Sequence, residues 1–106
     1  MKIYFHAPEY IHHSKHGTKC EQVIYHAFGA NVLNRFEFEG TPKTGHYNAF
    51  LFDQLYECDV IVVYPFEDGN IDEQMEWEIK MFMSLHRRTY FMFSDYRIVR
   101  YEEVIE

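Results

Sequence analysis

The segment "DVIVVYPF", residues 59–66, decides the fold prediction. Its apolar residues run continuously from Val60 and do not alternate with polar ones. Such a run is typical of a strand that is covered on both faces, as in parallel sheets with helices above and below. The segment therefore predicts a central strand and an α/β protein.

The flanking segments extend this pattern. Further strands are expected at residues 2–7 ("KIYFHA"), 31–38 ("NVLNRFEF") and 88–93 ("RTYFMF"), and a short edge strand in the tail 94–106. Helices are expected from about Thr18 to a stop at Gly29, over 46–58, and from Ile71 to Leu85. Alternating strands and helices predict one domain, residues 1–106, with a three-layer, doubly wound, flavodoxin-like fold around a mainly parallel sheet of four to five strands. Ligands of such sheets bind outside the carboxyl ends of the strands, here the loops after Ala7 and Phe66.

Composition narrows the classes of function. A chain of 106 residues with a formal net charge of −7 lacks the basic stripe of a nucleic-acid groove and does not suit an anionic membrane surface. No run approaches the ~20 apolar residues of a spanning helix. Without an export signal, the two cysteines are expected to be reduced thiols, and we expect a cytoplasmic protein. The aromatic content of 19% is high and suits a core, a subunit interface or a ligand pocket.

One carboxylate of the predicted 71–85 helix is expected to face the core and not the solvent. On a helical wheel, Glu78 follows Met75 by three positions and precedes Phe82 by four, so it lies within the apolar stripe. Burying an unpaired carboxylate costs several kcal/mol, so Glu78 is either paired inside the core rim or placed at a pocket. Glu76 is expected to form a solvated pair with Lys80. Asp72 suits the helix N-cap.

The segments "KIYFHAPEY" (2–10) and "CDVIVVYPFEDGNIDEQMEWEIKMFMSLHRRTYF" (58–91) resemble the nucleoside 2-deoxyribosyltransferase family. In that family a tyrosine lies on the first strand, an aspartate opens a later strand, and a nucleophilic glutamate follows a second aspartate by six residues. Tyr4, Asp59, Asp72 and Glu78 match these positions.

The resemblance implies a chemistry. Glu78 would attack the anomeric carbon of a ribosyl or deoxyribosyl group, Asp72 would help to protonate the departing base, and Tyr4 would orient Glu78 by a hydrogen bond. A nucleoside or nucleotide is the expected partner, in a homo-oligomer that needs no cofactor. The expected substrate-binding residues are Phe5, His6, Ala7, Pro8, Lys15, His16, Asp53, Pro65 and Phe66.

Departures from the family pattern keep a second function open. Family members usually have two small residues before the glutamate, where this sequence has Gln74 and Met75. Many members also have a further aspartate, where this sequence has Leu51; Asp53, two residues later, is a candidate to replace it. These changes favour a protein that binds a nucleotide-derived molecule without turnover, whereas Tyr4, Asp72 and Glu78 together favour an enzyme. An oligomeric interaction module without a ligand is a third alternative.

The histidine-rich segment "HHSKH", residues 12–16, has three interpretations. No zinc-site spacing follows it, so a metal site is disfavoured against a solvated loop. Alternatively, Lys15, His16 and Lys19 beside a helix start at Gly17-Thr18 would hold a 5′-phosphate. Trp77 lies off the apolar centre of its helix and is expected at a subunit contact. Phosphate-loop, dinucleotide-binding and nucleophile-elbow motifs are missing from the sequence.

Overall fold

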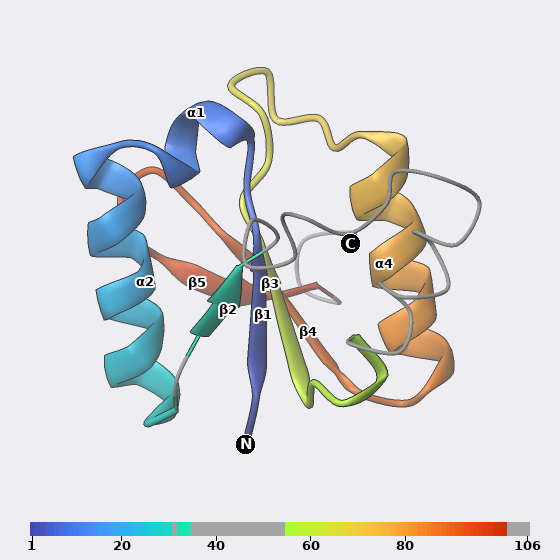
Figure 1. The fold of residues 1–106 in the computed structure, drawn as a ribbon. Coiled ribbons are helices and arrows are strands. Elements are labelled where there is room, and N and C mark those ends of the chain that lie inside the picture. The colour runs from blue at the N-terminus through green and yellow to red at the C-terminus, as the bar shows by residue number, and fades with distance from the viewer. Residues whose placement is uncertain (31, 35–54, 102–106) are drawn as a thin grey trace, which may run out of the picture.

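The strands that the structure describes form one five-stranded sheet. The structure is a computed structural model that describes residues 1–30, 32–34 and 55–101. The strands are β1 (Ile3–His6), β2 (Val32–Asn34), β3 (Val60–Val63), β4 (Arg88–Met92) and β5 (Ile98–Arg100), in the order β2-β1-β3-β4-β5. The first four are parallel and β5 runs antiparallel to β4 (Figure 1). This order is that of a doubly wound sheet. The predicted small α/β fold is confirmed.

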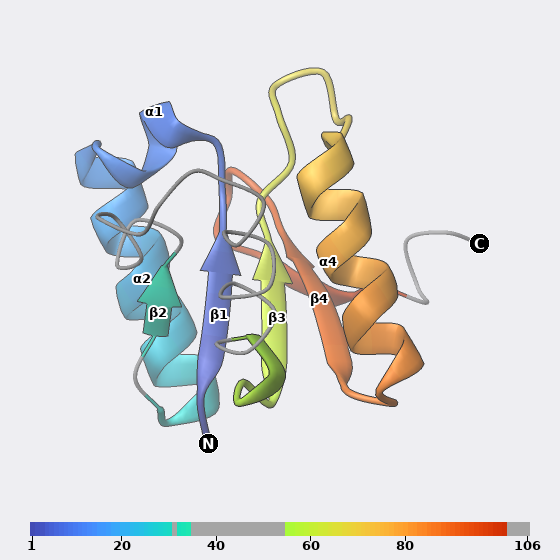
Figure 2. The same ribbon diagram turned by 45° about the vertical axis from the view of Figure 1, so that its right-hand side comes forward.

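Two long helices flank the sheet. Helix α2 (Lys15–Phe28) and helix α4 (Glu73–Ser84) lie on opposite sides of it, and the short helix α1 (Glu9–His12) precedes α2 (Figures 1 and 2). The predicted three-layer arrangement also involves residues 35–54, which lie outside the described residues, so its completeness stays a prediction. Residues 46–54 of the predicted helix over 46–58 and most of the predicted strand over 31–38 fall there too, whereas residues 55 and 56 are helical.

The apolar run of β3 packs against both sides of the sheet. Val60 and Val62 belong to the core on the α2 side, whereas Ile61 and Val63 belong to the core on the α4 side. All four side chains are fully buried. Because neighbouring side chains of a strand point to opposite faces, a strand covered on both faces has no polar positions. The interpretation of residues 59–66 as a central strand is confirmed.

Helix α2 begins and ends at capping residues. The Ser14 hydroxyl accepts a hydrogen bond of 3.0 Å from the Gly17 amide, and Gly29 ends the helix with φ 68°. Glycine adopts this left-handed conformation without a steric penalty. The predicted stop at Gly29 is confirmed. The start lies at Lys15, three residues before the predicted Thr18, because Ser14 provides the cap.

The sequence did not predict helix α1. The Pro8 carbonyl accepts a 2.9 Å hydrogen bond from the Ile11 amide, and the Ile11 side chain is buried. A Cβ on Gly17 would lie 1.9 Å from the Ile11 carbonyl oxygen. The α1 turn therefore lies directly on the first turn of α2, and only glycine fits between them.

Candidate functional site

Helix α4 places Glu78 inside the protein. Asp72 is its N-cap, and Asp72 Oδ1 accepts a hydrogen bond of 2.8 Å from the Met75 amide. The helix turns Met75, Glu78 and Ile79 toward the sheet, and the exposed fraction of Glu78 is 0%. The predicted inward orientation of Glu78 is confirmed. Glu76 lies on the outer side and pairs with Lys80 at 2.9 Å, also as predicted.

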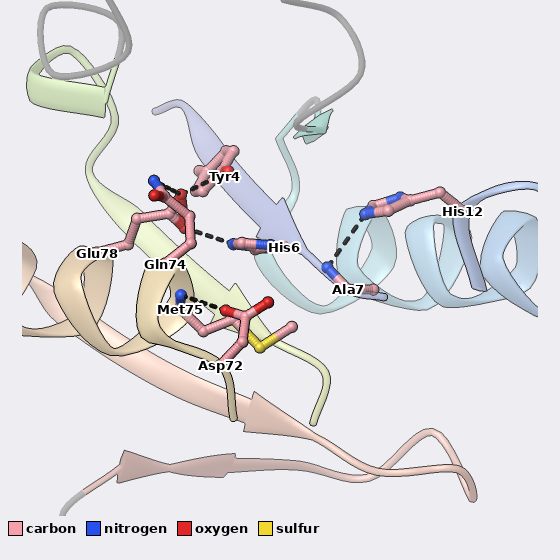
Figure 3. A network of polar contacts seen from close by, with 8 residues as sticks. All are labelled: Tyr4, His6, Ala7, His12, Asp72, Gln74, Met75 and Glu78. Atoms are coloured by element: carbon pink, nitrogen blue, oxygen red, sulfur yellow. Dashed lines mark hydrogen bonds and ion pairs between the residues drawn. The ribbon is translucent and has the colours of Figure 1, made fainter. Parts of the chain in front are cut away.

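Three side chains contact the Glu78 carboxylate (Figure 3). The Tyr4 hydroxyl donates to Oε1 at 2.9 Å, and Gln74 Nε2 donates to the same oxygen at 3.3 Å. The Nδ1 atom of His6 lies 2.5 Å from Oε2. Each carboxylate oxygen therefore has a hydrogen-bonding partner, which offsets the cost of removing it from water. Of the two possibilities that the sequence left open, the paired carboxylate is the one observed.

Strand β1 supplies two of these partners. Tyr4 and His6 are two positions apart and therefore point to the same face of the sheet, toward α4. Tyr4 is fully buried and His6 is 2% exposed. Their partner Glu78 lies 74 and 72 residues further along the chain. The contact between Tyr4 and Glu78 is the one that the family resemblance implies.

His6 contacts Glu78, which differs from its predicted role. It was expected to bind substrate, whereas its imidazole lies against the Glu78 carboxylate. The spacing of two from Tyr4 was the available signal, because it puts both residues on the same strand face. That signal was hidden because every residue of β1 is buried, so the strand shows no alternation of polar and apolar positions.

Two hollows adjoin this region at the carboxyl edge of the sheet. One, of about 420 Å³, lies at the ends of β3 and β4 and is lined mainly by aromatic and apolar residues, including Tyr64, Pro65 and Phe93. The other, of about 500 Å³, is lined by Ile71 and Asp72 among others. Phe66 and Tyr10 line both. The predicted loop after Phe66 thus borders both hollows, and Asp72 combines its capping role with a position at one of them.

Glu78, Tyr4 and His6 do not line either of these hollows. Among the three partners of Glu78, Gln74 is the one that is only half-buried. A ligand that approaches Glu78 from the start of α4 would therefore meet Gln74 first. Gln74 is one of the two residues that depart from the small residues that the resemblance implies before the glutamate.

Other predicted binding residues lie elsewhere. Phe5 is fully buried on the α2 side of the sheet and packs edge-on against the His12 ring, so it does not join Glu78. The Ala7 amide donates to His12 Nε2 at 3.1 Å, and Pro8 is the buried N-cap residue of α1. These residues build the turn after β1. Asp53 and Leu51 fall outside the described residues.

The residues expected to hold a 5′-phosphate at the start of α2 make other contacts in the structure. Both ring nitrogens of His16 lie 2.9 Å from tyrosine hydroxyls, those of Tyr96 and Tyr64. The Lys19 ammonium lies 4.8 Å from the centre of the Tyr96 ring. The Gly17 amide, expected to attract an anion, is bonded to Ser14. The Lys15 side chain is exposed, as expected. His16 links α2 to Tyr64, just after β3, and to Tyr96 in the β4–β5 turn.

Burial raises the pKa of both cysteine thiols. Cys20 and Cys58 are fully buried and neither forms a disulfide. Desolvation raises the pKa of each thiol to about 11. Neither thiol is therefore a candidate nucleophile. Among the described residues, no group of three or more His, Cys, Asp or Glu side chains is placed to hold a metal ion.

Comparison of the chain with protein-family models, with curated proteins and with solved structures gives no match. The resemblance to nucleoside 2-deoxyribosyltransferases therefore stays a prediction that depends on the matched residues of this sequence. Within the part of the chain that the structure describes, none of the helices has both the length and the apolar character needed to cross a bilayer.

Proposed function

We propose that the protein cleaves the N-glycosidic bond of a nucleoside or nucleotide, or transfers its glycosyl group, with Glu78 as the nucleophile. The observation that supports this best is the 2.9 Å hydrogen bond from the Tyr4 hydroxyl to Glu78 Oε1 within a buried site. An enzyme of this chemistry needs a carboxylate held in one orientation. Tyr4 and His6 hold the two oxygens of Glu78 from a central strand of the sheet.

The proposed reaction has two steps. One Glu78 oxygen bonds to the anomeric carbon while the bond from that carbon to the base nitrogen breaks, and the base nitrogen receives the electron pair and a proton from Asp72. The result is a glycosyl ester on Glu78. Water or a second base then attacks the same carbon, gives up a proton to Asp72, and releases the Glu78 carboxylate. Gln74 must move away from Oε1 in the first step.

The two hollows at the carboxyl edge of the sheet, one of them lined by Asp72, support the assignment of a planar base as the leaving group. Tyr10, Tyr64 and Phe66 line them, and such rings stack on nucleobases. Asp72 lies at the entrance to α4, between these rings and Glu78 along the chain. A base seated among the aromatic residues would have a carboxyl group within the same hollow to protonate it.

The test is incubation with a panel of deoxynucleosides, ribonucleosides and their monophosphates, with and without an acceptor base. Free base is followed by chromatography. We expect release by the natural protein and a loss of at least about a hundredfold in Glu78→Gln, which keeps the shape of the side chain. Glu76→Gln, on the exposed side of the same helix, is the matched control. Equal release by the Glu78→Gln and natural proteins would contradict the proposal.

A second candidate is a binding protein that holds the same class of molecule without turnover. The half-buried Gln74 side chain over Glu78 Oε1 favours it, because this oxygen is then already occupied. In that case a ligand from the panel raises the melting temperature without release of base, since a ligand at about 100 times its Kd stabilises by about 2.7 kcal/mol. Release of base that depends on Glu78 would exclude this candidate.

We also propose that the protein acts in the cytoplasm as a homo-oligomer. Trp77 and Met83 of α4 are 40% and 41% exposed, so each is open to a contact with a second subunit. The free thiols suit a reducing compartment. Sedimentation of the purified protein as a monomer at all concentrations would contradict the oligomer.

A further inference from the structure

The two oxygens of the Glu78 carboxylate have different partners (Figure 3). Oε2 lies 2.5 Å from Nδ1 of His6, which is its partner among the described residues. Oε1 accepts hydrogen bonds from Tyr4 at 2.9 Å and from Gln74 at 3.3 Å. Since hydrogen bonds weaken as they lengthen, His6 holds Oε2 more firmly than Gln74 holds Oε1.

Oε1 is the oxygen that can be freed for a reaction. A carboxylate oxygen has two lone pairs, so Tyr4 can keep one of them while movement of Gln74 frees the other. Gln74 is half-buried and therefore has room to move toward solvent. Oε2 offers no such route, because its partner His6 is only 2% exposed. In the proposed reaction, Oε1 is therefore the oxygen that attacks the anomeric carbon.

The charge on Glu78 changes in opposite directions in the two steps. In the first step, Oε1 bonds to the anomeric carbon and the carboxylate loses its negative charge. In the second step, this bond breaks and its electron pair returns to the carboxylate, while water or a second base bonds to the carbon and gives its proton to Asp72. Delocalisation places part of the returning charge on Oε2. A donor aimed at Oε2 therefore assists the second step and not the first.

We propose that His6 is a positioning residue that donates a hydrogen bond from Nδ1 to Glu78 Oε2 and thereby speeds the release of the glycosyl group from Glu78. This inference rests on the proposed function. The His6 ring lies at the end of β1 beside the Tyr4 ring, with the two centroids 6.0 Å apart. Because the pair of His6 and Glu78 is buried, little solvent competes for this hydrogen bond, and its effect on Oε2 is stronger than in water.

Two substitutions at residue 6 separate the hydrogen-bond donor from the volume of the ring. His6→Phe keeps a ring but has no donor, whereas His6→Asn has an amide nitrogen close to the position of Nδ1 but lacks part of the ring. We expect His6→Phe to release about one molecule of base per protein rapidly and then to slow at least about tenfold, as the glycosyl ester accumulates. His6→Asn is expected to turn over at close to the natural rate. A role in packing alone predicts the reverse order.

The test combines rapid-quench measurement of free base with mass spectrometry of the intact protein. The substrates are the same deoxynucleosides, ribonucleosides and monophosphates, and acid-quenched protein is examined for the added mass of one glycosyl group. We expect this mass on His6→Phe and not on His6→Asn. His26→Phe, at an exposed histidine of α2, is the matched control and is expected to behave as the natural protein does. Circular dichroism checks the folding of each variant.

NMR of the natural protein tests the same hydrogen bond without a substitution. Long-range ¹H–¹⁵N spectra of histidine-labelled protein locate the ring protons, and the signal of His6 is identified by its loss in His6→Asn. We expect a proton on Nδ1. A bare Nδ1 would overturn the inference even if His6→Phe does not fold, because Glu78 would then be the donor.

The outcomes also distinguish this inference from the proposed function. Base release that is the same in Glu78→Gln and in the natural protein, or no release from any substrate, would overturn both. Release that depends on Glu78, with no burst and no ester in a folded His6→Phe protein, would overturn only the role of His6. A slower rate in His6→Asn than in His6→Phe would also overturn it, since the volume of the ring would then matter more than the donor.

Discussion

Glu78 shows how a single acidic residue can be kept inside an apolar core. Its described partners are a phenol, an imidazole and an amide, and no lysine or arginine is among them. Such partners can donate hydrogen bonds without fixing a permanent positive charge beside the carboxylate. An arginine would bind the carboxylate more firmly and weaken it as a nucleophile. The partner set therefore suits a carboxylate that must react, and it also suits one that only has to be buried.

Removing the hydroxyl of Tyr4 is expected to destabilise the protein. Tyr4→Phe keeps the ring in the core but leaves Glu78 Oε1 with Gln74, at 3.3 Å, as its partner among the described residues. Loss of a buried hydrogen-bond partner costs about 1–3 kcal/mol. Urea denaturation measures this difference, with Tyr25→Phe, at a 48% exposed tyrosine, as the control. An unchanged free energy of unfolding in Tyr4→Phe would show that this hydrogen bond contributes nothing to stability.

At the scale of elements, the start of α4 combines a helix cap with a position at a hollow. Asp72 caps the helix, and the same carboxyl group borders a hollow. These two roles have different chemical requirements. A cap needs an oxygen that accepts a hydrogen bond, which asparagine also has, whereas proton donation to a leaving base needs a carboxyl group.

Two substitutions at Asp72 separate these roles. Asp72→Ala removes the cap and is expected to lower the free energy of unfolding by about 1 kcal/mol. Asp72→Asn keeps a capping oxygen, so its stability is expected to stay close to that of the natural protein while base release falls. Denaturation and the chromatographic assay together measure both effects. Full base release by a stable Asp72→Asn protein would remove Asp72 from the proposed mechanism.

The elements that could be predicted are those whose own sequence pattern determines them. The apolar run of residues 60–63 and the wheel of α4 identified a central strand and an inward carboxylate without knowledge of the rest of the chain. Helix α1 has four residues and no periodicity of its own; it depends on Ile11 reaching the core and on the absence of a side chain at Gly17. The pairing of His6 with Glu78 depends on how closely β1 and α4 pack, and this cannot be predicted from the sequence of either element alone.

For the whole molecule, the buried thiols predict how stability varies at high pH. Cys20 and Cys58 have pKa values of about 11 in the folded protein, against 9.0 when exposed. Below pH 9 both states are protonated and the thiols have no effect. Between about pH 9 and pH 11 the unfolded chain loses these protons first, so the folded state becomes less stable, by up to about 2–3 kcal/mol for each thiol at pH 11.

Denaturant unfolding from pH 8 to pH 10.5 checks this prediction. The double variant Cys20→Ala/Cys58→Ala is expected to be less stable at neutral pH because it leaves cavities, but to lose less stability as the pH rises. The comparison of slopes removes the contribution of lysines and tyrosines, which titrate in both proteins. Identical slopes would show that the thiols ionise alike in the folded and unfolded chains.

The proposed oligomer gives a second prediction for the whole molecule. Trp77→Lys places a charge on the outer side of α4 and is expected to weaken self-association more than tenfold, because buried tryptophans dominate many interfaces. Sedimentation equilibrium measures the change. Tyr25→Lys, at a comparably exposed aromatic residue on α2, is the control. A decrease of equal size in both variants would place the contact elsewhere than α4.

The separation of 74 residues between Tyr4 and Glu78 has a consequence for the order of events during folding. The acid lies on one of the last long elements of the chain, and its partners lie on the first strand, which pairs with β2 and β3 in the middle of the sheet. Closing so long a loop is slow compared with forming a helix. On a ribosome, the emerging helix would therefore carry a solvated glutamate, and its contacts with Tyr4 and His6 would form only when α4 packs against the first strand.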